Sequence, residues 1–249
     1  MKLFCFHHAG GEVSAFSGWQ RALGPEAEVV PVRLPGRDRT GRSPRYRDLT
    51  SLVRALADDL GPQLSGPHVF YGHSMGALVA YRLTRERLAR GAPPPERLLV
   101  GAFPAPHLPP PLGELESLPD IDVVRLLVGS GGIPDALLDA PEWVRRKVVL
   151  LRADIRICES GEGDRTTRNA VPLPCPVEVF AGTDDPLLSV ADAAAWSAHT
   201  QQGCTLHSVP GGHFFPRESK ELFFAGLRAA LARAGRRRDQ AATAVPHSA

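Results

Sequence analysis

The chain has 249 residues, of which 43% are hydrophobic and 22% are charged, and its formal net charge is +2. This length suits one α/β domain with a full hydrophobic core, and so small a net charge gives no indication of nucleic-acid binding. No apolar run reaches the roughly 18–20 residues of a membrane-spanning helix. The four cysteines lack the spacing of a zinc site, so we expect reduced thiols in a cytoplasmic protein without a signal peptide.

Hydrophobic patterning predicts strands that alternate with helices along most of the chain. The predicted strands are, in chain order, residues 3–6, 28–34, 68–71, 97–103, 177–181 and 205–209. Helices are predicted at 15–23, 49–64, 77–89, 190–199 and 220–234, where apolar residues recur at helical spacing. Ser189 is expected to cap the helix at 190–199, with Asp192 in the box position. This alternation predicts a mostly parallel sheet covered by helices on both faces.

Residues 104–174 interrupt the alternation and are interpreted as a helical lid inserted between two strands. The segment opens with several prolines and then shows helical patterns at 121–128, 135–138 and 142–158. An insertion of this size is most simply a lid, and the alternative is extra scaffold. We predict a single domain over residues 1–235, followed by a disordered tail at 236–249.

Residues 72–76 read Gly-His-Ser-Met-Gly, which is the pattern G-x-S-x-G. The pattern lies between a predicted strand and a predicted helix, and this is the context of the nucleophile elbow of α/β-hydrolases. Larger flanking side chains would collide in so tight a turn. The sequence therefore predicts an α/β-hydrolase fold with Ser74 as the exposed nucleophile, and His73 is expected to pack beneath it.

A serine nucleophile needs a base and an acid, which follow it along the chain in this fold. His213 lies on a Gly-rich loop after the last predicted strand and is the predicted base. Asp184 and Asp185 follow the strand at 177–181 and compete for the acid role. We favour Asp185, because Pro186 restricts its backbone to extended conformations; Asp184 then turns outward or stabilises the loop.

An oxyanion hole needs two backbone N–H donors. Met75, at the start of the helix after the elbow, supplies one. The other comes from the glycine-containing loop after the first strand, where Ala9 is favoured and His8 is the alternative. His7 and His8 have no third ligand at a suitable spacing, so neither a metal nor a cofactor is expected.

At this point the chain resembles type II thioesterases, the free-standing editing hydrolases of polyketide and nonribosomal peptide assembly lines. The resemblance runs from Leu3 to about Leu231. Its motifs lie at residues 4–11, 34–37, 72–77, 118–120, 131–134, 151–156, 182–186 and 211–215. The resemblance implies hydrolysis of aberrant acyl groups from the phosphopantetheine arm of acyl or peptidyl carrier proteins. We expect a monomer, although the sequence leaves the oligomeric state open.

Two groups of residues are expected to contact such a substrate. Leu126, Leu127 and Trp143 in the predicted lid are candidate walls for the acyl chain. Arg37 and Arg42 belong to an arginine-rich stretch after a predicted strand. They are candidates for docking the carrier protein or its phosphate, and the alternative for them is an ordinary solvated loop.

Two other functions remain open at this stage. An esterase or lipase acting on small esters would use the same triad, although the lid motifs favour a thioesterase. A non-catalytic binding protein of the same fold is the other alternative, but such a protein should lack one of Ser74, Asp185 and His213.

Overall fold

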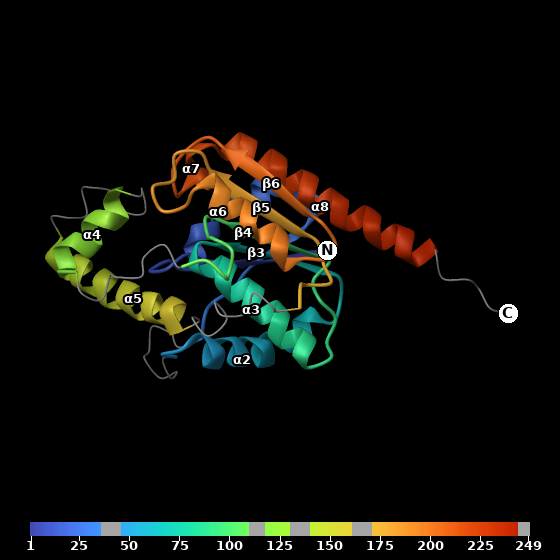
Figure 1. Ribbon diagram of the computed structural model, residues 1–249, viewed down its shortest axis with the longest axis horizontal. Coiled ribbons are helices and arrows are strands. Elements are labelled where there is room, and N and C mark those ends of the chain that lie inside the picture. The colour runs from blue at the N-terminus through green and yellow to red at the C-terminus, as the bar shows by residue number, and fades with distance from the viewer. Residues whose placement is uncertain (36–45, 110–117, 130–139, 161–170, 244–249) are drawn as a thin grey trace.

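The computed structural model describes residues 1–35, 46–109, 118–129, 140–160 and 171–243 (Figure 1). Its centre is a six-stranded sheet in the order β2-β1-β3-β4-β5-β6, in which every neighbouring pair is parallel. The strands are β1 (Lys2–Phe6), β2 (Glu28–Pro31), β3 (His68–His73), β4 (Arg97–Gly101), β5 (Val177–Gly182) and β6 (Cys204–Val209). The predicted parallel sheet is confirmed.

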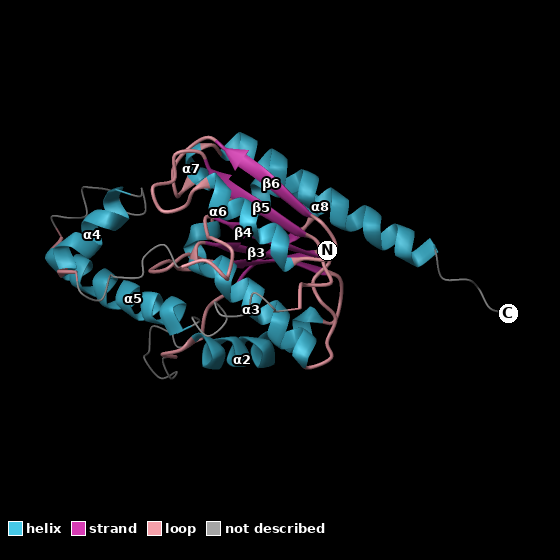
Figure 2. Cartoon of the chain, in the orientation of Figure 1, coloured by secondary structure: helices cyan, strands magenta, loops and turns pink. Residues whose placement is uncertain are grey.

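Helices cover both faces of the sheet (Figure 2). The helices α2 (Leu49–Leu60), α3 (Met75–Ala89) and α6 (Val190–Ala194) pack on one face, and α1 (Trp19–Leu23) and α8 (Lys220–Thr243) pack on the other. Alternate residues of a strand point to opposite faces, so Phe4 and Phe6 join the core on the α2 and α3 side. Leu3 and Cys5 join the core beneath α1 and α8.

Short helical turns connect several of these elements. They are the 3-10 helices at Val13–Phe16, Gly24–Glu26, Gly61–Leu64 and Ala195–His199, and the short helix α7 at Phe215–Glu218. The cap predicted at Ser189 is present, since its hydroxyl accepts the backbone N–H of Asp192 at 3.0 Å. The predicted helix at 15–23 is divided, because Gly18 adopts φ +81° between the 3-10 turn and α1.

Two helices of the insertion after β4 stand beside the carboxyl ends of the strands (Figure 1). These are α4 (Asp120–Gly129) and α5 (Pro141–Glu159), as predicted at 121–128 and 142–158. Arg152 of α5 joins the two helices by donating to the Leu118 carbonyl at 2.5 Å and to the Asp120 carboxylate at 2.7 Å. The helix predicted at 135–138 lies outside the described residues.

The prediction of a disordered tail from residue 236 onward is wrong for its first eight residues. Helix α8 continues to Thr243 and extends beyond the sheet (Figure 1). Residues 236–243 are rich in Arg, Gln and Ala, which favour helix, so the loss of apolar periodicity does not end the helix there. In the part of the chain that the structure describes, no helix is both long and apolar enough to cross a membrane.

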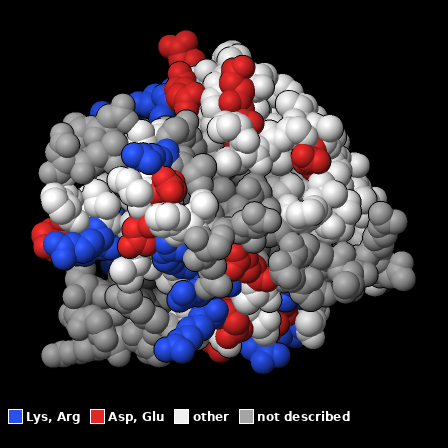
Figure 3. All heavy atoms as spheres, turned by 60° about the vertical axis from the view of Figure 1, so that its left-hand side comes forward, with Lys and Arg blue, Asp and Glu red and all other residues white. Residues whose placement is uncertain are grey.

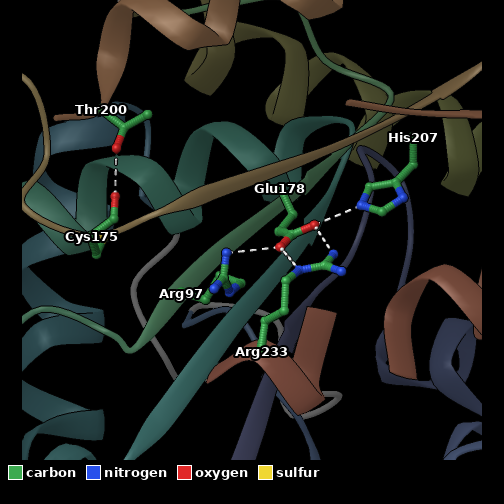
Figure 4. Close-up of polar contacts among 6 residues, drawn as sticks. All are labelled: Arg97, Cys175, Glu178, Thr200, His207 and Arg233. Carbon is green, nitrogen blue, oxygen red and sulfur yellow. Dashed lines mark hydrogen bonds and ion pairs between the residues drawn. The ribbon is translucent and has the colours of Figure 1, made fainter. Parts of the chain in front are cut away.

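A buried carboxylate, Glu178, joins three strands to α8 (Figure 4). Its fully buried side chain accepts from Arg97 of β4 at 2.8 Å, from Arg233 of α8 at 2.7 Å and from His207 of β6 at 2.6 Å. Burial raises the pKa of Glu178, but hydrogen bonds from His207 and Arg233 and the charge of Arg97 outweigh it. The pKa therefore lies below its usual value, and the group is a paired buried anion.

We predict that Glu178→Ala lowers the free energy of unfolding by about 3–5 kcal/mol, because it leaves buried arginine charge uncompensated. Asp122→Ala, which removes only an exposed pair with Arg125, should change it little and serves as the control. Urea denaturation measures both.

The buried contacts of Glu178 also predict how the stability of the fold depends on pH. The folded-state pKa of Glu178 is depressed, so its contribution is present above the unfolded pKa and is lost as the pH falls through the folded value. Below about pH 4, stability should therefore fall more steeply in the wild type than in Glu178→Gln. Equal slopes would contradict this account.

Candidate active site

Ser74 lies at the crossing from β3 to α3 in a backbone conformation that non-glycine residues rarely adopt. Its φ and ψ are 53° and −123°, and its N–H donates to the Gly101 carbonyl at 2.7 Å. A Cβ on Gly72 would lie 2.1 Å from the Gly76 carbonyl oxygen, and one on Gly76 would lie 2.1 Å from that of Phe6. The packing therefore requires both glycines and presents a half-buried Ser74 at the start of a helix.

The loops after β5 and β6 bring an aspartate and a histidine together. The Nδ1 atom of His213 lies 2.9 Å from Oδ2 of Asp185, and both side chains are buried. Oδ1 of Asp185 accepts the N–H of Leu187 at 2.9 Å, which fixes the carboxylate. Because a carboxylate accepts, Nδ1 carries the proton and Nε2 of a neutral His213 is left with the lone pair that a base needs.

Asp184 contacts backbone and hydroxyl groups of the same two loops. Its N–H donates to the Gly211 carbonyl at 3.0 Å, and its exposed carboxylate accepts the Thr183 hydroxyl at 2.9 Å. The carboxylate also lies 3.4 Å from the N–H of Gly211. Of the two aspartates that compete for the acid role, Asp185 is the one that contacts His213.

A buried chain of hydrogen bonds runs beneath Ser74. The Tyr71 hydroxyl lies 3.1 Å from Nδ1 of His73, and Nε2 of His73 lies 2.9 Å from the His213 carbonyl oxygen. Since a carbonyl only accepts, Nε2 carries the proton and Nδ1 accepts from Tyr71. Burial, followed by the charge of His213, lowers the pKa of His73 well below its usual value, which keeps the ring neutral. His73 thus packs beneath the elbow and holds the backbone of the histidine loop.

The two predicted oxyanion donors lie on segments that touch. Met75 is the first residue of α3, where backbone N–H groups have no partner within the helix. Gly76 meets the backbone of Phe6 and His7, so the loop that carries Ala9 begins against the first turn of α3. Within this loop the His8 carbonyl accepts the N–H of Gly11 at 3.0 Å. The fold therefore brings the start of the loop that carries Ala9 against the turn of helix that follows Ser74.

Next to this loop lies a pocket of about 670 Å³. Its lining includes Ala9 and Gly10 of the loop, Trp143 and Lys147 of α5, and Arg217 of α7. Of the residues predicted to contact the acyl chain, Trp143 is the one that the described part of the structure places near the loop after β1. His8 also lines the pocket, and burial and the neighbouring His73 hold the pKa of its ring well below the usual value.

Four predicted residues cannot be placed in this way. Arg37 and Arg42 lie outside the described residues, as do the side chains of Leu126 and Leu127 on α4.

Comparison with known proteins assigns the chain to a family. A family model described as a thioesterase domain matches residues 1–229. The chain belongs to the thioesterase family. Among its relatives, the gramicidin S biosynthesis protein GrsT of Aneurinibacillus migulanus is 32% identical over 220 residues, which cover 88% of this chain and 84% of GrsT.

Solved structures of thioesterases share the fold. RedJ, a thioesterase from the prodiginine biosynthetic pathway in Streptomyces coelicolor, is 36% identical with a TM-score of 0.81, covering 91% of this chain and 85% of RedJ. The type II thioesterase BorB from the borrelidin biosynthetic cluster is 32% identical with a TM-score of 0.79, covering 92% of each chain. The resemblance to type II thioesterases and the α/β-hydrolase fold are confirmed, and the chain is a hydrolase that acts on thioesters.

Two residues of this thioesterase that contact the loop after β1 were assigned no function from the sequence. They are Asp154 of α5, which accepts the N–H of Gly10, and Lys147 of α5, which donates to the Gly10 carbonyl. Asp154 lies in the family-like motif at 151–156, which was the one available signal. No local pattern links it to a loop 144 residues away.

We predict different outcomes for the two neighbouring aspartates. Asp185→Asn should lower kcat for a thioester by about 10²-fold or more, because an amide favours the wrong tautomer of His213. Asp184→Asn should change kcat by only a few-fold, since its contacts lie within the loops. Steady-state kinetics measures both, and a larger effect of Asp184→Asn would overturn the assignment of the acid.

Proposed function

We propose that this thioesterase hydrolyses acyl thioesters from the phosphopantetheine arm of carrier proteins in polyketide or nonribosomal peptide biosynthesis, and so removes aberrant acyl groups. Similarity to GrsT, RedJ and BorB, whose names place them in such pathways, supports the pathway. The observation that carries the chemistry is the buried pair of His213 and Asp185 at 2.9 Å, on loops at the same edge of the sheet as Ser74.

In the proposed mechanism, Ser74 attacks the thioester carbonyl while Nε2 of His213 takes the hydroxyl proton. Asp185 holds the ring through Nδ1 and stabilises the imidazolium that forms. The N–H groups of Met75 and Ala9 stabilise the oxyanion of the tetrahedral intermediate.

The thiolate then leaves with little help from an acid, because its thiol has a pKa of about 8.5, and it takes the proton from Nε2 of His213. Nε2 then takes a proton from the water that attacks the acyl-enzyme, and it returns this proton to the Ser74 oxygen when the second tetrahedral intermediate collapses and the free acid departs. No step needs a group that the chain does not supply, apart from water and the substrate.

The pocket beside Ala9 is a candidate to receive part of the substrate, with Trp143 as one wall. Leu126 and Leu127 stay candidate walls for the acyl chain. Arg37 and Arg42 stay candidates for contact with the carrier or its phosphate. On the lid side of the molecule, Lys and Arg are interspersed with Asp and Glu among the described residues in view (Figure 3). We propose a monomer that meets its carrier in the cytoplasm.

The proposed substrate class predicts a preference that kinetics can measure. One acyl group is presented as its carrier-protein thioester, as a thioester of a small thiol and as an oxygen ester. We expect kcat/KM to fall at least 10-fold from the carrier thioester to the small thioester, because remote contacts with the carrier are lost. We expect a further fall for the oxygen ester, whose alkoxide is a poorer leaving group.

Ser74→Ala, prepared in parallel, measures the background rate of hydrolysis by contaminating enzymes. Equal kcat/KM for the carrier and small thioesters would contradict the proposed carrier partner. A higher kcat/KM for the oxygen ester would favour the esterase alternative.

A further inference from the structure

Helix α5 of the lid holds the loop after β1 at Gly10. The Gly10 N–H donates to Oδ2 of Asp154 at 2.6 Å, and the Lys147 ammonium donates to the Gly10 carbonyl at 3.1 Å. Asp154 is buried, with 1% of its surface exposed. Lys147 and Asp154 are seven residues apart and therefore lie on one face of the helix. One helix face thus binds both polar groups of a single glycine.

Apolar packing reinforces these two hydrogen bonds. Val123 of α4 and Leu151 and Ile155 of α5 form a small buried cluster, and Ala9 packs against it. Gly10 adopts φ +70°, and a Cβ on it would lie 3.7 Å from the Leu151 side chain. The loop therefore rests directly on the two lid helices.

Three successive peptide groups of the loop have partners that fix their planes. The His8 carbonyl accepts from the N–H of Gly11 at 3.0 Å and lies 2.9 Å from Nδ1 of His7. Because the N–H and C=O of a trans peptide point in opposite directions, this turns the N–H of Ala9 away from those donors. Asp154 fixes the next peptide through the Gly10 N–H, and Lys147 fixes the third through the Gly10 carbonyl.

We propose that Asp154 is a positioning residue: by holding the peptide that follows the one bearing the Ala9 N–H, it keeps that N–H directed into the site, so that the lid helix completes the oxyanion hole from outside the sheet. The inference rests on the proposed role of Ala9 as a donor. A carboxylate close to a developing oxyanion would repel it, so the contribution of Asp154 is geometric. Lys147, from the same helix, places a cation at the same glycine.

The test compares variants that remove, weaken or spare the contact, assayed on an acyl thioester of a small thiol. Loss of one oxyanion donor costs about 10²–10³-fold in kcat. In Asp154→Ala the donor is misdirected but still present, so we expect kcat to fall about 10–100-fold while KM stays nearly unchanged. Asp154→Asn keeps an acceptor oxygen and should lose less than Asp154→Ala. Glu142→Gln, a matched change at an exposed position of α5, should have no effect.

A second readout separates positioning from folding. The serine oxygen adds to the carbonyl of a trifluoromethyl ketone analogue and forms a tetrahedral oxyanion. The matched amide analogue binds without forming an oxyanion. In Asp154→Ala the affinity for the ketone should fall about 10–100-fold, in parallel with kcat, while the affinity for the amide stays the same. Urea denaturation of each variant establishes that the protein assayed is folded.

Equal losses of affinity for ketone and amide would overturn the proposal. So would wild-type kcat in a folded Asp154→Ala. Neither result bears on the proposed carrier substrate, because these assays contain no carrier protein, and Ser74→Ala tests the nucleophile separately.

Discussion

The contact between the first turn of α3 and the ends of β1 and β3 is the constraint on which the rest of the site depends. Gly72 and Gly76 allow a backbone approach that any Cβ would prevent, by placing carbon 2.1 Å from a carbonyl oxygen. This approach puts Ser74 in its strained conformation and sets the start of α3 beside the loop that carries Ala9. One packing arrangement thus positions the proposed nucleophile and the segments that carry the proposed oxyanion donors.

The residues proposed to act with Ser74 are held by contacts that reach across the sheet. Asp185 orients the His213 ring, and His73, from beneath the elbow, holds the backbone of the same residue. The His73 contact ties the loop after β6 to the strand that leads into Ser74. The contact of Asp154 with Gly10 extends the same principle to the lid, because a helix outside the sheet holds a loop at the edge of the sheet.

The sequence was most informative where chemistry and local structure coincide. Residues 72–76 predict the elbow because the turn itself demands glycine, and the six strands follow from short apolar runs. Asp185 was favoured over Asp184 from the proline that follows it, and the structure places that residue against His213.

Long-range contacts left no comparable signal. His73 contacts the His213 carbonyl across 140 residues of chain, and Asp154 accepts the Gly10 N–H across 144, so no spacing rule connects these pairs. The extension of α8 to Thr243 was missed because its last residues have helix propensity without apolar periodicity.

The central claim is that Ser74 forms the acyl-enzyme, and capture of that intermediate tests it most directly. The protein is mixed with an acyl thioester, quenched in acid within milliseconds to seconds, digested and mapped by mass spectrometry. The account predicts the mass of the acyl group on the peptide that contains Ser74, and neither acylation nor turnover above background in Ser74→Ala. Acylation of a different residue, or turnover by Ser74→Ala at the wild-type rate, would contradict it.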